Sequence, residues 1–143
     1  MSAQTKQQTD QLIFRKTNAL KGRTISITPE NSSMKHLSYG RIILDKQVPN
    51  VSFTTGNQES GLICLSGKCT ITCDGVANEI AQYDSIYLPR DSQIEITTDS
   101  EVDLAECLAD VENNYPLQVV RYADVEKDGS LRFKTGGASN SRS

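Results

Sequence analysis

The chain has 143 residues, a formal net charge of −3 and a hydrophobic fraction of 36%. This length suits one ordinary domain, and the absence of any run of basic residues argues against a nucleic-acid partner bound through its phosphate backbone. The sequence also lacks the ~20 consecutive apolar residues of a membrane-spanning helix and opens without an apolar signal segment, so we expect no membrane partner and a cytoplasmic location.

Both ends of the chain are polar. Residues 1–10 contain almost no apolar side chains, and residues 134–143 are rich in Gly, Ser and Asn. Segments of this composition bury too little apolar surface to offset the conformational entropy lost on ordering. We therefore predict a flexible N-terminal segment over 1–10, a folded domain over 11–133, and a flexible tail or interdomain linker over 134–143.

Short strand-like runs closed by turn residues dominate the folded part. The first three runs are 24–28, 39–44 and 51–55, which end at a proline, an aspartate and a glycine respectively. Alternation of apolar and polar residues with a period of two is typical of strands that bury one face. These segments are therefore predicted to be β-strands.

The clearest strand pattern follows between residues 62 and 80. Runs at 62–65, 68–73 and 76–80 are separated by Ser66-Gly67 and Asp74-Gly75. Asp-Gly between two alternating runs is a strong hairpin signal, because a type I′ turn needs positive φ at both central residues. We predict a turn at each of the two pairs.

The predicted strands continue at 85–88, 93–97 and 102–108, with 119–120 and 131–133 as weaker edge strands. Helical periodicity is weak along the whole chain. Many short strands spaced ~8–12 residues apart predict a sandwich or a barrel. The expected core consists of one apolar face of these strands: Ile42, Leu44, Phe53, Leu62, Cys64, Ile71, Cys73, Ile86, Leu88, Ile94, Ile96, Leu104 and Leu108.

The chain has four cysteines, Cys64, Cys69, Cys73 and Cys107, and none of them forms a Cys-x-x-Cys pair. Cys69 and Cys73 are an even number of residues apart, so on one strand they would share a face. We interpret all four as small buried residues in a reducing compartment, with a disulfide or a metal role as the alternative. Residues 111–115 are expected to hold one helical turn at most.

Residues 59–109 resemble a cupin, the small double-sheet jelly-roll barrel. The features that carry the resemblance are the segment Gly61–Gly67, the Asp74-Gly75 hairpin and the segment Asp84–Pro89. The resemblance implies an all-β, cupin-type double-stranded β-helix, a jelly-roll barrel, formed by a single domain.

A closer resemblance extends over nearly the whole chain. Ile13–Lys16, the run at 102–107, Leu117–Val120 and Gly136–Arg142 are similar, in order and spacing, to the first half of the 5-deoxy-glucuronate isomerases of inositol catabolism. The related 4-deoxy-hexosulose-uronate ketol isomerases also carry two cupin-like halves in tandem. The resemblance implies that this chain is similar to the N-terminal half of an isomerase of carbohydrate metabolism.

Cupin metal sites resemble the pattern Gly-x5-His-x-His-x3,4-Glu-x6-Gly. With Gly67 at the end of this pattern, the glutamate position falls on Ser60. The two histidine positions fall on residues 53 and 55, which are Phe and Thr, or on residues 54 and 56, which are Thr and Gly. None of these alternatives supplies an imidazole or a carboxylate.

The second cupin pattern resembles Gly-x5-Pro-x-Gly-x2-His-x3-Asn. With Pro89 in place, its histidine position falls on Ile94 and its glycine positions on Tyr83 and Asp91, and the only histidine of the chain is His36. A divalent transition metal needs several imidazole or carboxylate ligands that converge on it. We therefore expect no metal and no cofactor in this chain, and the resemblance implies that the family's zinc site lies in the second half.

No catalytic residue can be assigned, but four residues are pocket candidates: Glu59, Tyr87, Arg90 and Ile94. Glu59 would lie at the mouth of the barrel, and Glu59, Glu95 or Tyr87 could act as the base that an aldose–ketose isomerisation needs. Arg90 could bind the carboxylate of a sugar acid, against the simpler interpretation of an ordinary polar turn. His36 is expected to be a surface or hydrogen-bonded residue.

Three functions remain open. The first is an N-terminal cupin module of a deoxy-glucuronate isomerase-type sugar-acid isomerase. This module would lack metal ligands and be inactive alone. Its role would be structural, as a homodimer or packed against a second cupin half. The alternative is a stand-alone, metal-free cupin that binds a small ligand, such as a sugar acid, or a protein partner without catalysis. The third is a catalytic aldose–ketose isomerase that uses Glu59, His36 and cysteines as unusual ligands.

Overall fold

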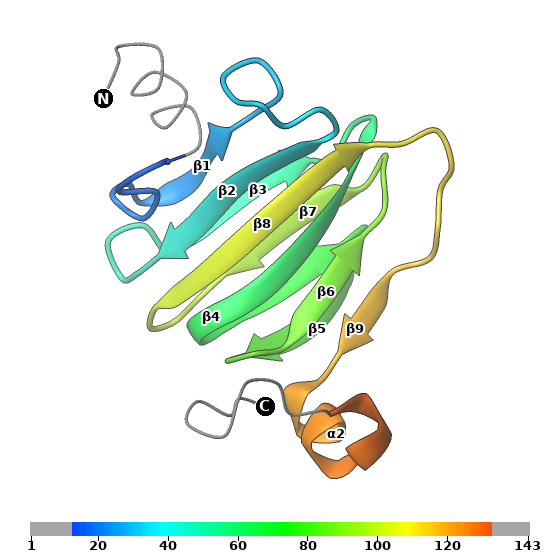
Figure 1. Cartoon of the computed structure of the whole chain (residues 1–143). Helices are drawn as coiled ribbons and strands as arrows, with labels where there is room; N and C mark the ends of the chain where they lie inside the picture. Colours follow the sequence, from blue (N-terminus) through cyan, green and yellow to red (C-terminus); the bar gives the residue numbers. More distant parts are fainter. Residues whose placement is uncertain (1–12, 133–143) are drawn as a thin grey trace, which may run out of the picture.

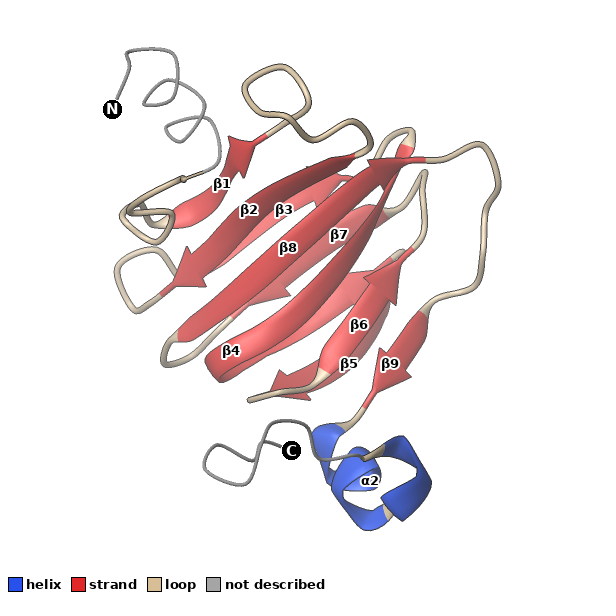
Figure 2. Ribbon diagram, in the orientation of Figure 1, coloured by secondary structure: helices blue, strands red, loops and turns tan. Residues whose placement is uncertain are grey.

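The computed structural model describes residues 13–132, so the terminal segments predicted at 1–10 and 134–143 lie outside the described residues. Within this range nearly all of the regular secondary structure is β-strand, as predicted (Figures 1 and 2). The elements in order are β1 (Gly22–Ile27), β2 (Leu37–Leu44), β3 (Asn50–Thr54), β4 (Gln58–Cys73), β5 (Val76–Ala81), β6 (Ser85–Leu88), β7 (Gln93–Thr97), β8 (Val102–Asp110), β9 (Gln118–Val120), α2 (Tyr122–Lys127) and the 3₁₀ turn η1 (Gly129–Leu131).

The strands form two layers, which we call the front layer and the back layer. The front layer has the order β1-β2-β8-β4-β6-β9, and the back layer places β7 between β3 and β4, with β5 on the other side of β4. Every strand pair is antiparallel. In Figure 1 the front layer faces the viewer and β3, β5 and β7 lie behind it.

Strand β4 belongs to both layers. Its first part pairs with β6 and β8 in the front layer, and its second part pairs with β5 and β7 in the back layer. The turn predicted at Ser66-Gly67 is therefore wrong, because the strand continues through it with a register shift between Cys64 and Ser66. Gly67 has φ of 77°. A bulge with a glycine in this conformation bends a strand without ending it.

The predicted hairpin at Asp74-Gly75 is confirmed. These two residues link β4 to β5, and they have φ of 48° and 84°. Both values lie in the left-handed region that a type I′ turn requires. Local sequence therefore determines this turn.

The core lies between the two layers and matches the prediction closely. Every expected core residue is buried except Phe53, which is partly buried and packs against the core. Cys69 joins the core, in agreement with the interpretation of the cysteines as buried, and Ile80 and Val102 join it although they were not predicted. Cys64, Cys69 and Cys73 are buried and form no disulfide. Cys107 is exposed, because the alternation along β8 turns its neighbours Glu106 and Leu108 inward. The prediction that Cys107 is buried is therefore wrong.

The C-terminal segment differs from the prediction at one strand. Leu131 lies in the 3₁₀ turn η1 rather than in an edge strand, whereas residues 111–115, expected to hold one helical turn at most, hold none. The segment is held to the barrel by Asp84, whose carboxylate accepts hydrogen bonds from the backbone N–H of Tyr122 at 2.8 Å and of Ala81 at 3.0 Å. Among the described residues, no helix has the length and apolar character needed to cross a membrane.

Candidate functional site

The barrel interior contains a buried ion pair between β1 and β8. The Glu106 side chain is fully buried, and its carboxylate accepts a hydrogen bond from Arg23 Nε at 2.8 Å and another from Arg23 Nη2 at 3.3 Å. The Ser60 hydroxyl donates to the same carboxylate at 2.6 Å. A buried carboxylate is tolerated only when it is paired and hydrogen-bonded, and here both of its oxygens have partners.

The Arg23 guanidinium is also fixed by the back layer. Its central carbon lies 3.8 Å from the centroid of the Phe53 ring, a cation–π contact. The contact with Phe53 and the two hydrogen bonds to Glu106 together leave this side chain little rotational freedom. Arg23 thus connects the two layers at the edge where β1 approaches β3.

The interior positions that correspond to the cupin ligand pattern are now defined. Thr55 is buried and Phe53 packs against the core, whereas Thr54 and Gly56 are exposed, so the histidine positions correspond to residues 53 and 55. Ser60 and Ile94 are fully buried, and Ile94 pairs directly with Phe53 across β3 and β7. All four side chains point into the barrel, as ligands would.

The backbone supports the same alignment. The glycine positions of the second pattern fall on Tyr83 and Asp91, and these residues have φ of 70° and 56°. Positive φ is the conformation for which glycine is normally selected. The chain therefore retains the left-handed turns of the pattern with other residues in the glycine positions.

The donor chemistry at these interior positions does not fit a zinc ion. Phe53 and Ile94 have no donor atom, and the Thr55 hydroxyl already donates to the Pro89 carbonyl at 2.7 Å and accepts from the Ser92 N–H at 2.9 Å. Glu106 is the nearby carboxylate of the ion pair and is neutralised by Arg23. Within residues 13–132, no group of three or more His, Cys, Asp or Glu side chains is placed to hold a metal.

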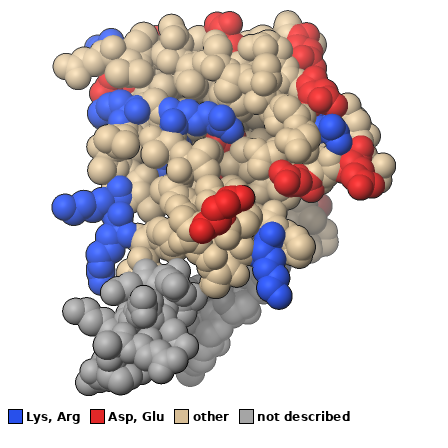
Figure 3. Space-filling view, turned by 90° about the horizontal axis from the view of Figure 1, so that it is seen from above, with Lys and Arg blue, Asp and Glu red and all other residues tan. Residues whose placement is uncertain are grey.

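A pocket of about 530 Å³ opens at the end of the barrel near the β1–β2 loop, and we call it the mouth pocket. Its wall includes Arg23, Lys35, His36, Glu30 and Asp110. Figure 3 views the molecule from this end, where basic side chains lie mostly to the left and acidic side chains mostly to the right. The predicted surface histidine, His36, is therefore part of a pocket wall.

Two of the four pocket candidates meet, but on the outside of the barrel. The Tyr87 hydroxyl donates to Glu59 Oε2 at 2.6 Å, and both side chains lie on the outer face of the front layer. Burial, together with the hydrogen bond to the Glu59 carboxylate and its negative charge, raises the pKa of Tyr87 to about 12. A tyrosine that holds its proton this strongly is a poor base at neutral pH.

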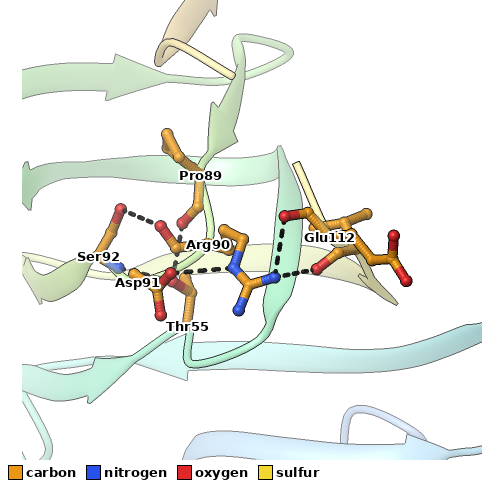
Figure 4. Close-up of polar contacts among 7 residues, drawn as sticks. Thr55, Pro89, Arg90, Asp91, Ser92 and Glu112 are labelled. Atoms are coloured by element: carbon orange, nitrogen blue, oxygen red, sulfur yellow. Dashed lines mark hydrogen bonds and ion pairs between the residues drawn. The ribbon is translucent and has the colours of Figure 1, made fainter. Parts of the chain in front are cut away.

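The Arg90 side chain forms hydrogen bonds within the protein (Figure 4). Its Nε donates to Asp91 at 2.9 Å, and its Nη1 donates to the carbonyl oxygens of Val111 and Glu112. These bonds tie the turn after β6 to the segment after β8, in agreement with the interpretation as a polar turn. Ile94, the fourth candidate, lies in the core and has no polar atom to offer a ligand.

The outer face of the front layer carries an apolar groove of about 280 Å³. The side chains that project there come from β4, β6, β8 and β9, and Ile63 and Val120 are each 49% exposed. We call this surface the front groove, and its lining includes Gly61, Ile63, Tyr87, Ala105, Cys107 and Val120 together with the polar Ser85 and Gln118.

The corresponding outer face of the back layer is polar. Its strands present hydroxyl, amide and carboxylate side chains to solvent: Ser52, Thr54, Thr70, Thr72, Gln93, Glu95 and Thr97. Antiparallel sheets with one solvated face normally show this apolar-in, polar-out alternation. The front layer departs from that alternation at the front groove.

Sequence reasoning missed both members of the buried ion pair. One signal was available, because Glu106 stands in phase with Val102, Leu104 and Leu108 on the predicted inward face of its run. A carboxylate at such a position requires a buried partner. The identity of that partner was not readable, since Arg23 lies 83 residues away.

Comparison with known proteins identifies similar sequences and structures. The sequence model of the KduI/IolB family matches residues 12–142. The 5-deoxy-glucuronate isomerase of Geobacillus kaustophilus is 24% identical over 115 residues, which are 73% of this chain and 41% of that protein. The chain thus spans about two fifths of the length of this curated relative.

Two solved structures have similar folds. The crystal structure of an IolB-like protein from Salmonella typhimurium superposes with a TM-score of 0.62 and 18% identity, over 70% of this chain and 41% of that one. The cupin domain of Cnp3 from Schizosaccharomyces pombe has a TM-score of 0.53 and 12% identity, over 82% and 74%. These likenesses confirm the predicted all-β cupin fold.

Proposed function

The chain belongs to the KduI/IolB family, as a cupin that resembles the N-terminal half of the 5-deoxy-glucuronate isomerases, and from this premise we propose that its own role is structural. In this proposal it is a module of a sugar-acid isomerase in inositol catabolism, it acts in the cytoplasm, and it does not catalyse the isomerisation by itself. It associates through the front groove with a second copy of the same fold.

The observation that carries this proposal is the contrast between the two outer faces. Exposed apolar side chains gather in the front groove, whereas the outer face of the back layer is polar. Grouped apolar residues on a soluble protein mark interaction surfaces more often than scattered single ones do. A two-fold symmetric association places one such face against its own copy, which buries both at once.

The interior donor set supports the absence of catalysis by this chain. Aldose–ketose isomerisation needs an electrophile that polarises the carbonyl and a base that moves the α proton. The four interior positions carry Phe, Thr, Ser and Ile, and the Glu106 carboxylate is committed to Arg23. The residues at these interior positions therefore provide neither the electrophile nor the base.

Sedimentation velocity of the purified full chain tests the structural role. We expect a dimer at micromolar concentration and a monomer for Ile63→Lys, because a lysine would place a charge in the apolar centre of the interface. Thr72→Lys on the outer face of the back layer is the matched control and should remain dimeric. A monomeric wild-type chain, or an Ile63→Lys variant that still dimerises like the control, refutes the proposed association.

A separate assay tests the absence of catalysis. The chain is dialysed against zinc and then assayed for conversion of 5-deoxy-glucuronate, before and after addition of a chelator. We expect no turnover in either state and no stoichiometric zinc by elemental analysis. Chelator-sensitive turnover would show that the chain is an enzyme in its own right.

A second function, that of a metal-free cupin that binds a small ligand, is favoured by the mouth pocket. Its volume of about 530 Å³ lies within the ~300–1,000 Å³ typical of small-molecule sites. This function and the structural role involve different surfaces and can coexist.

A further inference from the structure

Arg23 lines the mouth pocket, and part of its guanidinium has no hydrogen-bond partner among residues 13–132. A guanidinium carries five N–H donors, and Glu106 uses only those on Nε and Nη2. Among the hydrogen bonds of residues 13–132, Nη1 of Arg23 makes none. The side chain is 21% exposed, and it lines the mouth pocket. The end of the guanidinium therefore retains the pair of parallel donors that binds a carboxylate in two-point fashion.

This guanidinium is preorganised for a ligand. Its central carbon lies 3.8 Å from the centroid of the Phe53 ring, and Glu106 accepts hydrogen bonds from Nε and Nη2. Immobilising a side chain before binding removes most of the entropy that binding would otherwise lose. Glu106 also cancels the formal charge of Arg23, so an incoming carboxylate must gain from directed hydrogen bonds and from the nearby Lys35 and His36 rather than from an unpaired charge.

Two acidic residues also line the mouth pocket. Glu30 and Asp110 contribute carboxylates to its wall. These groups only accept hydrogen bonds when ionised, so the ligand must present donors to them. A second carboxylate placed beside Glu30 or Asp110 would instead meet like charge.

We propose that the mouth pocket binds a small organic acid whose carboxylate docks on the Nη1 end of the Arg23 guanidinium and whose hydroxyl or ammonium groups face Glu30 and Asp110. The ligand is thus a hydroxy acid or an amino acid, with its carboxylate at the Arg23 end. This site is separate from the front groove, so it stands or falls independently of the proposed dimer.

Calorimetric titration of the full chain with four probes tests the proposal and separates the two sources of donors. Gluconate has a carboxylate and hydroxyls, and glucitol has the hydroxyls without the carboxylate. The compound 6-aminohexanoate has a carboxylate and an ammonium, and hexanoate has the carboxylate alone. We expect either gluconate or 6-aminohexanoate to bind saturably, and its control, glucitol or hexanoate, to bind at least about tenfold more weakly, the loss of one charge-assisted contact.

Probe affinities of single-residue variants then locate the binding site. Lys35→Gln should weaken the bound probe severalfold, whereas Lys46→Gln, at a different surface pocket, should leave its affinity unchanged. Arg23→Lys keeps a cation beside Glu106 but removes the planar donor edge, and it should weaken the binding of whichever carboxylate-bearing probe the wild type binds, gluconate or 6-aminohexanoate, by about tenfold. If that variant does not fold, Lys35→Gln and Asp110→Asn alone decide the location.

Three outcomes overturn the proposal. One is that none of the four probes binds saturably to the wild-type chain at millimolar concentration. Another is that glucitol binds as tightly as gluconate and hexanoate as tightly as 6-aminohexanoate. The third is that Lys35→Gln and Asp110→Asn bind the probe with the same affinity as Lys46→Gln.

Discussion

Arg23 and Glu106 form an ion pair inside the barrel, with Arg23 Nε 2.8 Å from Glu106 Oε1 and no part of Glu106 exposed to solvent. The Ser60 hydroxyl, at the glutamate position of the cupin ligand pattern, donates to the same carboxylate. An arginine cation therefore lies beside the positions where a metal-binding cupin would carry its ligands. These positions thus adjoin a charged group, formed by Arg23 and Glu106 together with the Ser60 hydroxyl.

Removing one member of this pair should be strongly destabilising. Glu106→Gln leaves the Arg23 guanidinium without its counter-charge, and the expected loss is roughly 3 kcal/mol of unfolding free energy. The double variant Arg23→Met/Glu106→Leu removes both charges and should lose far less, because no unpaired charge stays in the barrel. Urea denaturation followed by circular dichroism measures both. If the single and the double variant lose the same unfolding free energy, packing rather than charge pairing accounts for the stability contributed by these residues.

The positive φ of Asp91 should be measurable as backbone strain. Asp91→Gly and Asp91→Ala both remove the carboxylate that contacts Arg90, but only the alanine variant retains a Cβ at φ of 56°. We expect the glycine variant to be more stable by about 1 kcal/mol. Thermal unfolding of the two variants side by side makes the comparison. Equal stability would mean that this turn relaxes to negative φ when the aspartate is replaced.

Asp84 should make the attachment of the C-terminal segment sensitive to acid. Burial alone would raise the pKa of Asp84, but the N–H groups of Ala81 and Tyr122 and the Arg121 guanidinium together lower it below the ordinary value of 3.8. A carboxyl with a depressed pKa in the folded state stabilises fully above its unfolded pKa, and this contribution is lost as the pH falls through the folded pKa.

The measurement for Asp84 is unfolding free energy as a function of pH, for the wild type and for Asp84→Asn. The wild type should lose stability below about pH 4, and the variant should show a shallower loss over the same interval. Amide hydrogen exchange at Tyr122 reports the same event locally, since its N–H is bound to Asp84. If the unfolding free energies of the two proteins fall equally with decreasing pH, Asp84 does not contribute to the acid sensitivity.

The pair formed by Tyr87 and Glu59 predicts a shifted tyrosine titration. Burial and the hydrogen bond to Glu59 raise the pKa of Tyr87 to about 12. Glu59→Gln removes the negative charge, so the pKa of Tyr87 should fall, although burial should keep it above the ordinary value of 10. Carbon-13 NMR of labelled tyrosine rings resolves this titration. A pKa that does not change in Glu59→Gln contradicts the contribution assigned to the carboxylate.

Much of the fold was predictable from local sequence. Period-two alternation located the strands, and β6 and β7 begin and end where the pattern predicted. The Asp74-Gly75 turn was predictable because its conformation depends on only two residues. The turn expected at Ser66-Gly67 was wrong because the same residue types also form a bulge, and only the pairing of β4 with both layers distinguishes the two.

The candidate sites were much less predictable. Glu59 was expected at the barrel mouth, but the alternation of β4 turns it outward, next to Tyr87. Arg90 binds backbone carbonyl oxygens, and its partners Val111 and Glu112 lie 21 and 22 residues away in the chain. The mouth pocket went unnoticed because its wall is assembled from β1, the β1–β2 loop and the ends of β4 and β8.

The sequence by itself determined which segments are strands, which of their residues are apolar, and that the cupin ligand positions hold no imidazole, because each of these depends on residue identity and short spacing. Only the tertiary structure decided that Arg23 neutralises Glu106, that Ser60 joins them, and that the front layer carries an apolar groove on its outside. The physical reason is that burial and charge pairing depend on contacts between residues far apart in the chain, such as the 83 residues that separate Arg23 from Glu106. Alternation along a strand defines two faces, and only packing decides what each face meets.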